Sequence, residues 1–373
     1  MGFFKEYREV KELLHSKHGI VFYAESRHYF QYFDKLIRDL LASGKKIIYL
    51  TSDSKDPLIQ SSFSGMRVIY VKYMLGTLFS RLKADIMIMT MPDLGNYLFK
   101  RSPTVGKYVY VFHAAVSTHQ QYSEKAFFNY DTIFCTGSYQ VEELRAAEVH
   151  FNLPQKELVP YGYPLINSIK TKTRNTGLRD KQTKTILIAP SWFPGCIFDT
   201  CIKELCQSLA SSPYRIIVRS HPEYEKRRKN DFNRLRHLIS RFPNMSIDTE
   251  PDVTTRLFDT DFLITDRSGI AFEFALGMER PVLFIDTELK EMNKEWRKLG
   301  IAPIENSMRD QLGTAILPGD VSQVPEKISL MEADREFSER MNSLEQSLFF
   351  HSYQEGLQFI SSHLLSADQI SSR

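Results

Sequence analysis

The feature that most constrains the fold is the alternation of short apolar runs with amphipathic stretches. Helical spacing of apolar residues is clear at 29–41 and 139–149, between such runs. The apolar runs have the length and composition of buried strands. They occupy residues 20–23, 46–50, 68–71, 86–89, 108–112, 132–135, 185–189, 215–219, 245–247, 262–264 and 282–285. The alternation predicts an α/β protein with two parallel, doubly wound sheets.

A basic, polar segment separates the two series of strands. Residues 168–185, "SIKTKTRNTGLRDKQTKT", contain six Lys or Arg and one Asp, which predicts an exposed linker. We therefore expect a Rossmann-like N-terminal domain at 1–167 and a second at 186–373, facing each other across a cleft. This is the GT-B architecture. The segment from Asp334 has a helical pattern, and we expect it to pack back on the N-terminal domain.

The composition is that of a globular protein with a mild positive charge. The net charge of +3 and pI of about 8.5 suit anionic ligands or a transient membrane contact, but not broad nucleic-acid binding. No apolar run reaches the roughly 20 residues that span a bilayer, and the N-terminus lacks a signal-peptide pattern. The four cysteines form no CxxC pair, which predicts free thiols in a reducing cytoplasm and no zinc. We expect neither a metal nor a cofactor.

His113 is the first candidate for chemistry, because it follows the apolar run 108–112. Ligands of doubly wound sheets bind at the carboxyl ends of the strands. An imidazole there can remove a proton from a hydroxyl nucleophile. A structural histidine bonded to a loop is the alternative, and His119 is the competing base.

Two further polar turns follow predicted strands. In "YRIIVRSHPEY" (214–224), Arg219 and His221 are placed to hold a diphosphate. In "ILIAPSWFPG" (186–195), Ser191 begins a turn that would also face the cleft. The alternatives are an ordinary basic surface turn and a hinge filled by Trp192.

The stretch "DFLITDRSGIAFEFALGMERPVLFID" (261–286) predicts a strand, a polar turn, a helix and a second strand. Ser268 and Gly269 then lie at a helix N-terminus, which binds anions. Glu273 lies one turn further on an otherwise apolar helix, where it can accept hydrogen bonds from ribose hydroxyls. Alternatively, Ser268 only caps the helix.

The N-terminal residues 3–14, "FFKEYREVKELL", predict an amphipathic helix with basic residues beside its apolar stripe. Such a helix suits an anionic membrane surface. Packing on the N-terminal domain is the alternative. The basic segment 168–185 is a second candidate for membrane contact.

The motifs "LITDRSGIAFEFALGMERPVLFID", "RSHPE" and "ILIAPSW" resemble the CDP-glycerol glycerophosphotransferase family of teichoic-acid primases and polymerases. The resemblance implies a GT-B fold and transfer of glycerol phosphate from CDP-glycerol to a hydroxyl of a membrane-linked acceptor, with release of CMP. It implies that His113 is the base and that His221 assists at the phosphates. It also places Thr265, Asp266 and Ser268 in the diphosphate loop and matches Glu273 to the family's helix carboxylate.

The chain departs from the family pattern near two of these residues. Phe112-His113-Ala114-Ala115 stands where the family usually has Trp-His-Gly-Thr, and Gly269 replaces a serine. We expect a divergent, cytoplasmic transferase of surface-polymer synthesis, peripheral at the inner membrane face, with a CDP-alcohol donor and a lipid-linked or polymer acceptor. The alternatives are a GT-B nucleotide-sugar glycosyltransferase and a catalytically silent nucleotide-binding module.

Overall fold

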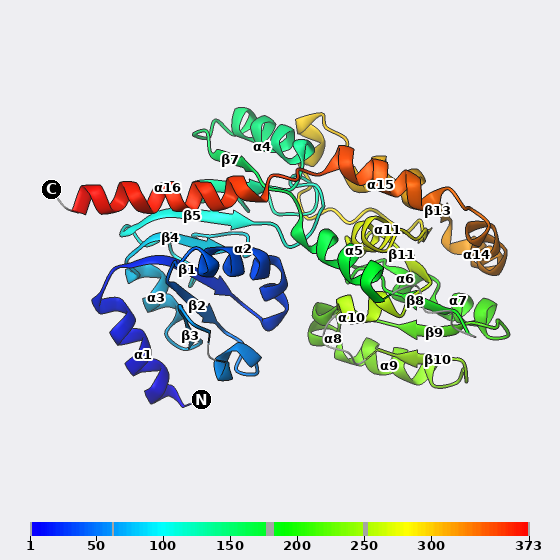
Figure 1. The fold of residues 1–373 in the computed structure, drawn as a ribbon. Coiled ribbons are helices and arrows are strands. Elements are labelled where there is room, and N and C mark those ends of the chain that lie inside the picture. Colours follow the sequence, from blue (N-terminus) through cyan, green and yellow to red (C-terminus); the bar gives the residue numbers. More distant parts are fainter. Residues whose placement is uncertain (1, 62, 177–182, 249–252, 372–373) are drawn as a thin grey trace.

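The computed structural model describes residues 2–61, 63–176, 183–248 and 253–371, and it contains two parallel sheets covered by helices (Figure 1). The first sheet has the strand order β3-β2-β1-β4-β5-β6-β7. Its strands are β1 His18–Ala24, β2 Ile47–Thr51, β3 Met66–Tyr70, β4 Ala84–Met89, β5 Val105–Val111, β6 Thr132–Cys135 and β7 Glu157–Pro160. This order, which reverses beside β1, is the doubly wound arrangement that the alternation predicts.

The second sheet has the order β10-β9-β8-β11-β12-β13. Its strands are β8 Thr185–Ile188, β9 Arg215–Val218, β10 Met245–Ile247, β11 Phe262–Thr265, β12 Val282–Ile285 and β13 Gly313–Ile316. Both sheets pair in parallel throughout, so the carboxyl ends of all strands in a sheet lie on one edge. The fold is α/β, as predicted.

Helices cover both sheets and join them. Those of the first half are α1 Phe3–His15, η1 Arg27–Tyr29, α2 Phe30–Ala42, η2 Pro57–Gln60, α3 Leu75–Arg81, α4 Ser138–His150 and α5 Pro164–Thr176. Those of the second half are α6 Ile197–Thr200, α7 Ile202–Leu209, α8 Pro222–Arg227, α9 Lys229–Ile239, α10 Val253–Phe258, α11 Ile270–Met278, η3 Trp296–Leu299, α12 Ile304–Ser307, α13 Arg309–Leu312, η4 Pro318–Gln323 and α14 Val324–Glu332. The last two helices are α15 Phe337–Leu348 and α16 Tyr353–Ser371.

The C-terminal helices cross from one half of the molecule to the other. Helix α15 packs on α11 of the second half, whereas α16 lies against α2, β4 and β7 of the first (Figure 1). Ile360 of α16 is buried in the core of the first sheet. We propose that each sheet defines one domain, at 1–167 and 186–373, with α16 returning to the first.

The segment 168–185 differs from the exposed linker that its composition predicts. Its residues up to 176 continue α5, and Ile169 and Lys170 are buried. Ile169 packs so closely on α11 that a Cβ at Gly277 would lie 2.9 Å from it. Lys170 pairs with Glu345 at 3.1 Å. Tertiary contacts thus recruit part of a polar segment into a helix, while residues 177–182 lie outside the described residues.

Candidate active site

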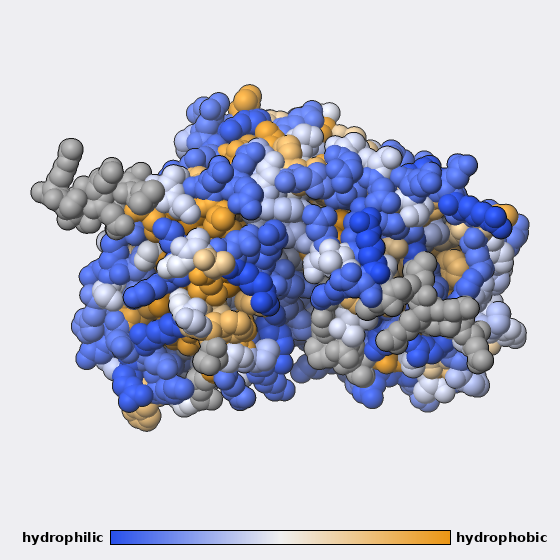
Figure 2. All heavy atoms as spheres, in the orientation of Figure 1, coloured by the Kyte–Doolittle hydropathy of each residue, from blue (hydrophilic) through white to orange (hydrophobic). Residues whose placement is uncertain are grey.

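A large hollow lies between the two halves, near the carboxyl ends of β9 and β10. Its volume is about 720 Å³, and its lining combines His28 of the first half with Arg219, Ser220 and Asp248 of the second. Figure 2 shows the surface hollowed between the two halves. A hollow of this size accommodates a nucleotide-sized ligand.

His113 lies just beyond the end of β5, in a setting that fixes its tautomer. Its Nδ1 is 3.1 Å from the carbonyl oxygen of Thr90, to which it donates. The rings of Tyr29, Tyr32 and Tyr122 pack around the imidazole with centroids 5.5–6.2 Å away. A proton on Nδ1 leaves Nε2 with the lone pair. Burial, with a smaller contribution from the positive charge of Lys290, lowers the pKa of His113 to about 4.

His221 begins α8 and has the opposite tautomer. Its Nδ1 accepts a hydrogen bond of 3.1 Å from the backbone N–H of Glu223, so neutral His221 carries its proton on Nε2. Its ring meets solvent at the cleft, but loss of bulk water on its other sides lowers its pKa to about 4, with Lys290 contributing. The charge of His113 also lowers the pKa of His221.

The turn from β11 to α11 is held from inside the protein by two of its predicted site residues. Asp266 is fully buried and accepts hydrogen bonds from the backbone N–H groups of Ser191 at 2.7 Å and Ile197 at 3.2 Å. The Thr265 hydroxyl, also fully buried, donates to the carbonyl of Ala189 at 2.7 Å. Because both side chains are fully buried, we propose that Thr265 and Asp266 contribute to the donor site by positioning this turn. Ser191 is tied to the same turn.

Ser268 and Gly269 bring this turn to the other half of the molecule. A Cβ at Gly269 would lie 3.0 Å from Val116 Cγ1 and 3.6 Å from Ala114 Cβ, in the loop that follows His113. The N-terminus of α11 thus lies against the His113 loop. Among the described residues the Ser268 hydroxyl has no hydrogen-bond partner, and the side chain does not cap α11. The turn therefore presents a hydroxyl and the first N–H groups of the helix together.

Arg219 and Glu273 have partners within the protein. Arg219 donates to buried Asp248 at 2.5 Å, and Arg256 binds the other oxygen of the same carboxylate at 2.9 Å. Glu273 accepts a hydrogen bond of 2.7 Å from the hydroxyl of Tyr163 and is buried. Both residues are near the cleft, but part of the hydrogen-bonding capacity of each is already used.

Lys290 is a further candidate residue, which the sequence pattern did not single out. It follows the carboxyl end of β12, and its charge lowers the pKa values of both His113 and His221. Burial in turn lowers the pKa of Lys290, whereas Glu305 and Asp266 raise it. Within the described part of the chain its ammonium forms no ion pair. The signal was its position in the polar segment after the predicted strand 282–285, at the same sheet edge as the other candidates.

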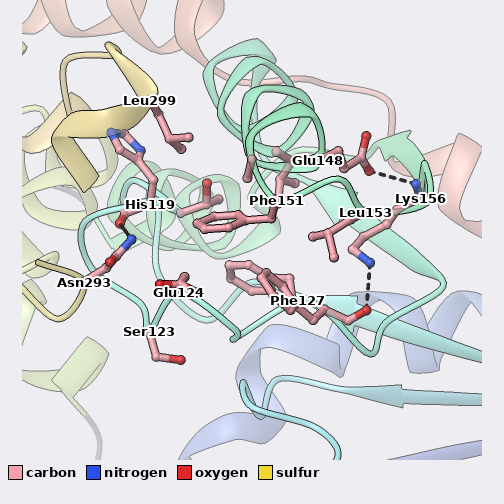
Figure 3. A pocket seen from close by; sticks show the side chains of 14 residues that line it. His119, Ser123, Glu124, Phe127, Glu148, Phe151, Leu153, Lys156, Asn293 and Leu299 are labelled. Atoms are coloured by element: carbon pink, nitrogen blue, oxygen red, sulfur yellow. Dashed lines mark hydrogen bonds between the residues drawn. The ribbon is translucent and has the colours of Figure 1, made fainter. Parts of the chain in front are cut away.

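His119, the alternative base, lies in the contact between the two halves rather than at the cleft. Its Nε2 donates to the carbonyl of Ile301 at 3.1 Å, and its Nδ1 is 3.2 Å from Glu143. Burial would lower the pKa of His119, but Glu143 and the Ile301 carbonyl raise it above its ordinary value. Figure 3 shows the cavity of about 30 Å³ beside it, which also involves Asn293. That cavity holds at most one or two water molecules.

The same contact contains a second buried carboxylate. Glu305 of α12 accepts hydrogen bonds from the N–H of Ser117 at 2.9 Å and from its hydroxyl at 3.1 Å. Burial raises the pKa of Glu305 to about 7. The loop after His113 is thus fastened to the second half at Ser117 and at His119.

No cluster of His, Cys, Asp or Glu suited to a metal ion occurs among the described residues. All four cysteines are buried free thiols. Nor does any helix in the described ranges have the length and apolar character needed to cross a membrane.

The model of the CDP-glycerol:poly(glycerophosphate) glycerophosphotransferase family matches residues 14–308. The chain belongs to this family. It is therefore a glycerophosphotransferase-like transferase, and its matched region includes every candidate residue described above. A search of curated proteins finds no matching sequence.

Solved structures agree on the fold. The wall teichoic acid polymerase TagF, as an H444N variant with CDPG, is 16% identical with a TM-score of 0.59, covering 95% of this chain and 90% of that one. The UDP-GlcNAc 2-epimerase of Neisseria meningitidis is 13% identical with a TM-score of 0.57, covering 96% and 100%. A glycosyltransferase of Rickettsia africae is 9% identical with a TM-score of 0.53, covering 94% and 99%. This glycerophosphotransferase-family chain thus has the predicted GT-B-like fold.

Proposed function

We propose that this transferase moves glycerol phosphate, or a related alcohol phosphate, from a CDP-activated donor to a hydroxyl of a membrane-linked surface-polymer acceptor. CMP is the other product. Family membership supports the class of reaction. The observations that carry the proposal are the opposite tautomers of His113 and His221 and the packing of the loop after His113 against the N-terminus of α11.

The tautomers assign a role to each histidine. Nε2 of His113 has the lone pair and removes the proton of the acceptor hydroxyl. The hydroxyl oxygen then bonds to the β-phosphorus of the donor, and the bond from that phosphorus to the bridging oxygen breaks. Nε2–H of His221 donates to the phosphate oxygens as charge develops on the leaving CMP.

The anionic donor adjusts the basicity of these histidines. Both have a pKa of about 4 in the free protein, partly because of Lys290. A bound diphosphate places negative charge beside them and beside Lys290, which raises the pKa of each imidazole. His113 therefore becomes an effective base when the donor is present.

We assign the donor to the second half of the cleft. Ser268, the N–H groups of Gly269 and Ile270, and Lys290 bind the diphosphate. The nucleoside occupies the hollow of about 720 Å³ beside Arg219, which Asp248 holds in place. Glu273, oriented by Tyr163, accepts hydrogen bonds from the ribose, and Ser191 supports the turn.

A panel of CDP-alcohols and nucleotide sugars tests the proposal. We expect CMP release from CDP-glycerol or another CDP-alcohol, and only when an acceptor with a free hydroxyl is present. Release of a nucleoside diphosphate from a nucleotide sugar would instead identify a glycosyltransferase. Binding of every donor without turnover would identify a silent nucleotide-binding module.

We place the enzyme in the cytoplasm, peripheral at the inner face of the membrane. The support is chemical: CDP-activated donors are water-soluble, whereas the proposed acceptor is anchored in lipid. The enzyme then has to bring a dissolved substrate and a membrane-bound one into the same cleft.

A further inference from the structure

Exposed hydrophobic side chains are concentrated on one part of the first half of the molecule. Ten large hydrophobic side chains are exposed in the described part of the chain, and six of them belong to three short segments. These six, which we call the aromatic edge, are Phe3, Phe4, Tyr7, Tyr73, Tyr97 and Leu98. Phe4 is 85% exposed and Tyr97 is 92% exposed. Exposed apolar side chains that cluster in this way mark interaction surfaces, whereas single ones do not.

Helix α1 divides its apolar residues between the core and this edge. Val10 and Leu13 are fully buried against the first sheet, which confirms that the helix packs on the N-terminal half. Phe3, Phe4 and Tyr7 project beyond that contact, and the ring of Phe3 lies 6.1 Å from that of Tyr73. The helix is both a packed element and a carrier of exposed aromatics.

The three segments are held together by specific contacts. Buried Glu6 accepts hydrogen bonds from the backbone N–H groups of Lys72 at 2.8 Å and Met74 at 2.7 Å, which fixes Tyr73 beside α1. Leu98 lies against the start of α3, because a Cβ at Gly76 would be 3.3 Å from its Cδ2. The loop that carries Tyr97 is closed by a hydrogen bond of 2.8 Å from Gly95 N–H to the Phe99 carbonyl. The aromatic edge is therefore a presented surface.

The aromatic edge lies on the same side of the first sheet as the cleft. Tyr73 follows the carboxyl end of β3, and Tyr97 follows that of β4. His113 follows the carboxyl end of β5, so these loops share one edge of a parallel sheet. Helix α1 precedes β1 and runs antiparallel to it (Figure 1), and the contact of Phe3 with Tyr73 places Phe3 at the same edge.

The chemistry around the aromatic edge selects the partner. Phenylalanine and tyrosine favour the boundary between lipid headgroups and acyl chains. Exposed Arg8 and Lys11 lie on α1, and the ammonium of Lys72 lies 6.0 Å from the ring centre of Tyr73. Neither Arg8, Lys11 nor Lys72 forms an ion pair within the described residues. Exposed aromatic rings with exposed basic side chains beside them match an anionic lipid surface.

We propose that the aromatic edge docks on anionic lipid and holds the cleft at the membrane surface. In this position the cleft receives the membrane-linked acceptor at His113, a consequence that rests on the proposed function. The docking itself does not, because it depends only on residues outside the cleft.

Sedimentation with vesicles tests the docking. Wild-type protein should pellet with vesicles of phosphatidylglycerol and phosphatidylcholine in equal parts, and much less with phosphatidylcholine alone. Phe3→Ser combined with Phe4→Ser should weaken the partition by about tenfold or more, because two apolar rings no longer leave water for the lipid. The matched control is Val149→Ser combined with Leu330→Ser, which alters two exposed apolar residues of α4 and α14 and should partition like wild type.

Equal pelleting of the Phe3/Phe4 variant and wild type, or no pelleting of wild type, overturns the proposal. The proposal is also overturned if wild type forms a dimer without vesicles and the Phe3/Phe4 variant does not, because a second copy of the chain would then cover the aromatic edge. Phe4→Trp gives a second measurement: brominated lipid should quench its added fluorescence, and absence of quenching also overturns the proposal.

Assays of CDP-glycerol turnover with a water-soluble acceptor keep the two proposals separate. The Phe3/Phe4 variant should retain this turnover while losing vesicle binding. Vesicle binding without any turnover by wild type would remove the proposed function and leave the docking surface standing.

Discussion

At the scale of single residues, the chemistry depends on which ring nitrogen carries a proton. A carbonyl holds the proton on Nδ1 of His113, whereas a helix N–H holds it off Nδ1 of His221. The two Nε2 atoms are therefore an acceptor and a donor at neutral pH. One residue type thus supplies both halves of a proton transfer, without requiring either ring to be charged.

Replacing His113 with alanine should abolish most of the transfer while leaving donor binding intact. Loss of a general base lowers rates by about 10²–10⁴. Steady-state kinetics should show the loss in kcat, and calorimetry with CDP should give an unchanged Kd. His237→Ala, on the exposed face of α9, is the control. Near-normal kcat in a folded His113→Ala protein would rule out its role as base.

Replacing Ser268 or His221 with alanine should instead weaken donor binding. Each substitution removes a hydrogen bond to the diphosphate, which contributes roughly 1–3 kcal/mol. Titration calorimetry with CDP measures the effect, with Ser329→Ala on α14 as the control. Unchanged affinity in both variants would place the nucleotide elsewhere.

At the scale of elements, the turn between β11 and α11 shows how a buried carboxylate builds a binding loop. Asp266 gathers backbone N–H groups from its own turn and from the segment after β8. It therefore sets the position of Ser191 and the direction of α11 together. Its side chain is fully buried, so we propose that it shapes the loop without contacting the ligand.

Asp266→Asn should therefore reduce both stability and donor affinity. The amide has only one acceptor oxygen, so at least one buried N–H loses its partner, at a cost of about 1–3 kcal/mol. Urea unfolding measures the stability, and calorimetry with CDP measures the affinity. Asp320→Asn in η4 is the control, since its side chain has no hydrogen bond or ion pair among the described residues. A variant as stable as wild type would contradict this role.

Complete burial made several strands easy to predict from the sequence. Strands such as β6 and β12, buried at every position, were predicted from their apolar runs. The edge strands β7 and β13 were missed, because they are half-exposed and lack a continuous apolar pattern. Strand β13 even begins at a glycine, since a Cβ at Gly313 would lie within 2 Å of the Val282 carbonyl oxygen.

The sequence could predict which residues follow strand ends and so belong near the cleft. It could not predict which contacts their side chains make. His113 and His221 follow strands, so topology alone brings them to the cleft. Whether a side chain in such a turn faces the cleft or the interior depends on neighbouring segments. For this reason the sequence could place Thr265 and Asp266 in the turn but not show that their side chains are buried, and it gave no reason to select Lys290.

At the scale of the whole molecule, the two halves meet through buried polar groups. Glu305 binds Ser117, and His119 lies between Glu143 and the Ile301 carbonyl. These contacts fix the loop after His113 to the half that carries α11. The relative position of base and donor site is thus linked to the protonation of a few buried groups.

The raised pKa of Glu305 predicts how stability changes with pH. Its pKa is about 7 in the folded protein, whereas an unperturbed glutamate has a pKa of 4.5. The unfolded chain releases the proton first, so the contribution is complete below pH 4.5 and is lost as pH rises through 7. Glu305→Gln should remove this loss, which amounts to roughly 1–3 kcal/mol.

Urea unfolding at pH ~5 and pH ~8 measures this dependence. Wild type should lose more stability between these values than Glu305→Gln does. Glu326→Gln, an exposed change on α14, should behave like wild type. Identical pH profiles for wild type and Glu305→Gln would contradict the prediction.

Gly269 sets how closely the two halves of the protein approach each other beside the cleft. A methyl group at this position would lie 3.0 Å from Val116 Cγ1 in the other half. The neighbouring side chain would have to move away by a few tenths of an ångström. Proton transfer and phosphoryl transfer both tolerate little misplacement of the reacting atoms. The absence of a side chain at Gly269 therefore sets the spacing between the two halves, and with it the distance across which the two proposed substrates react.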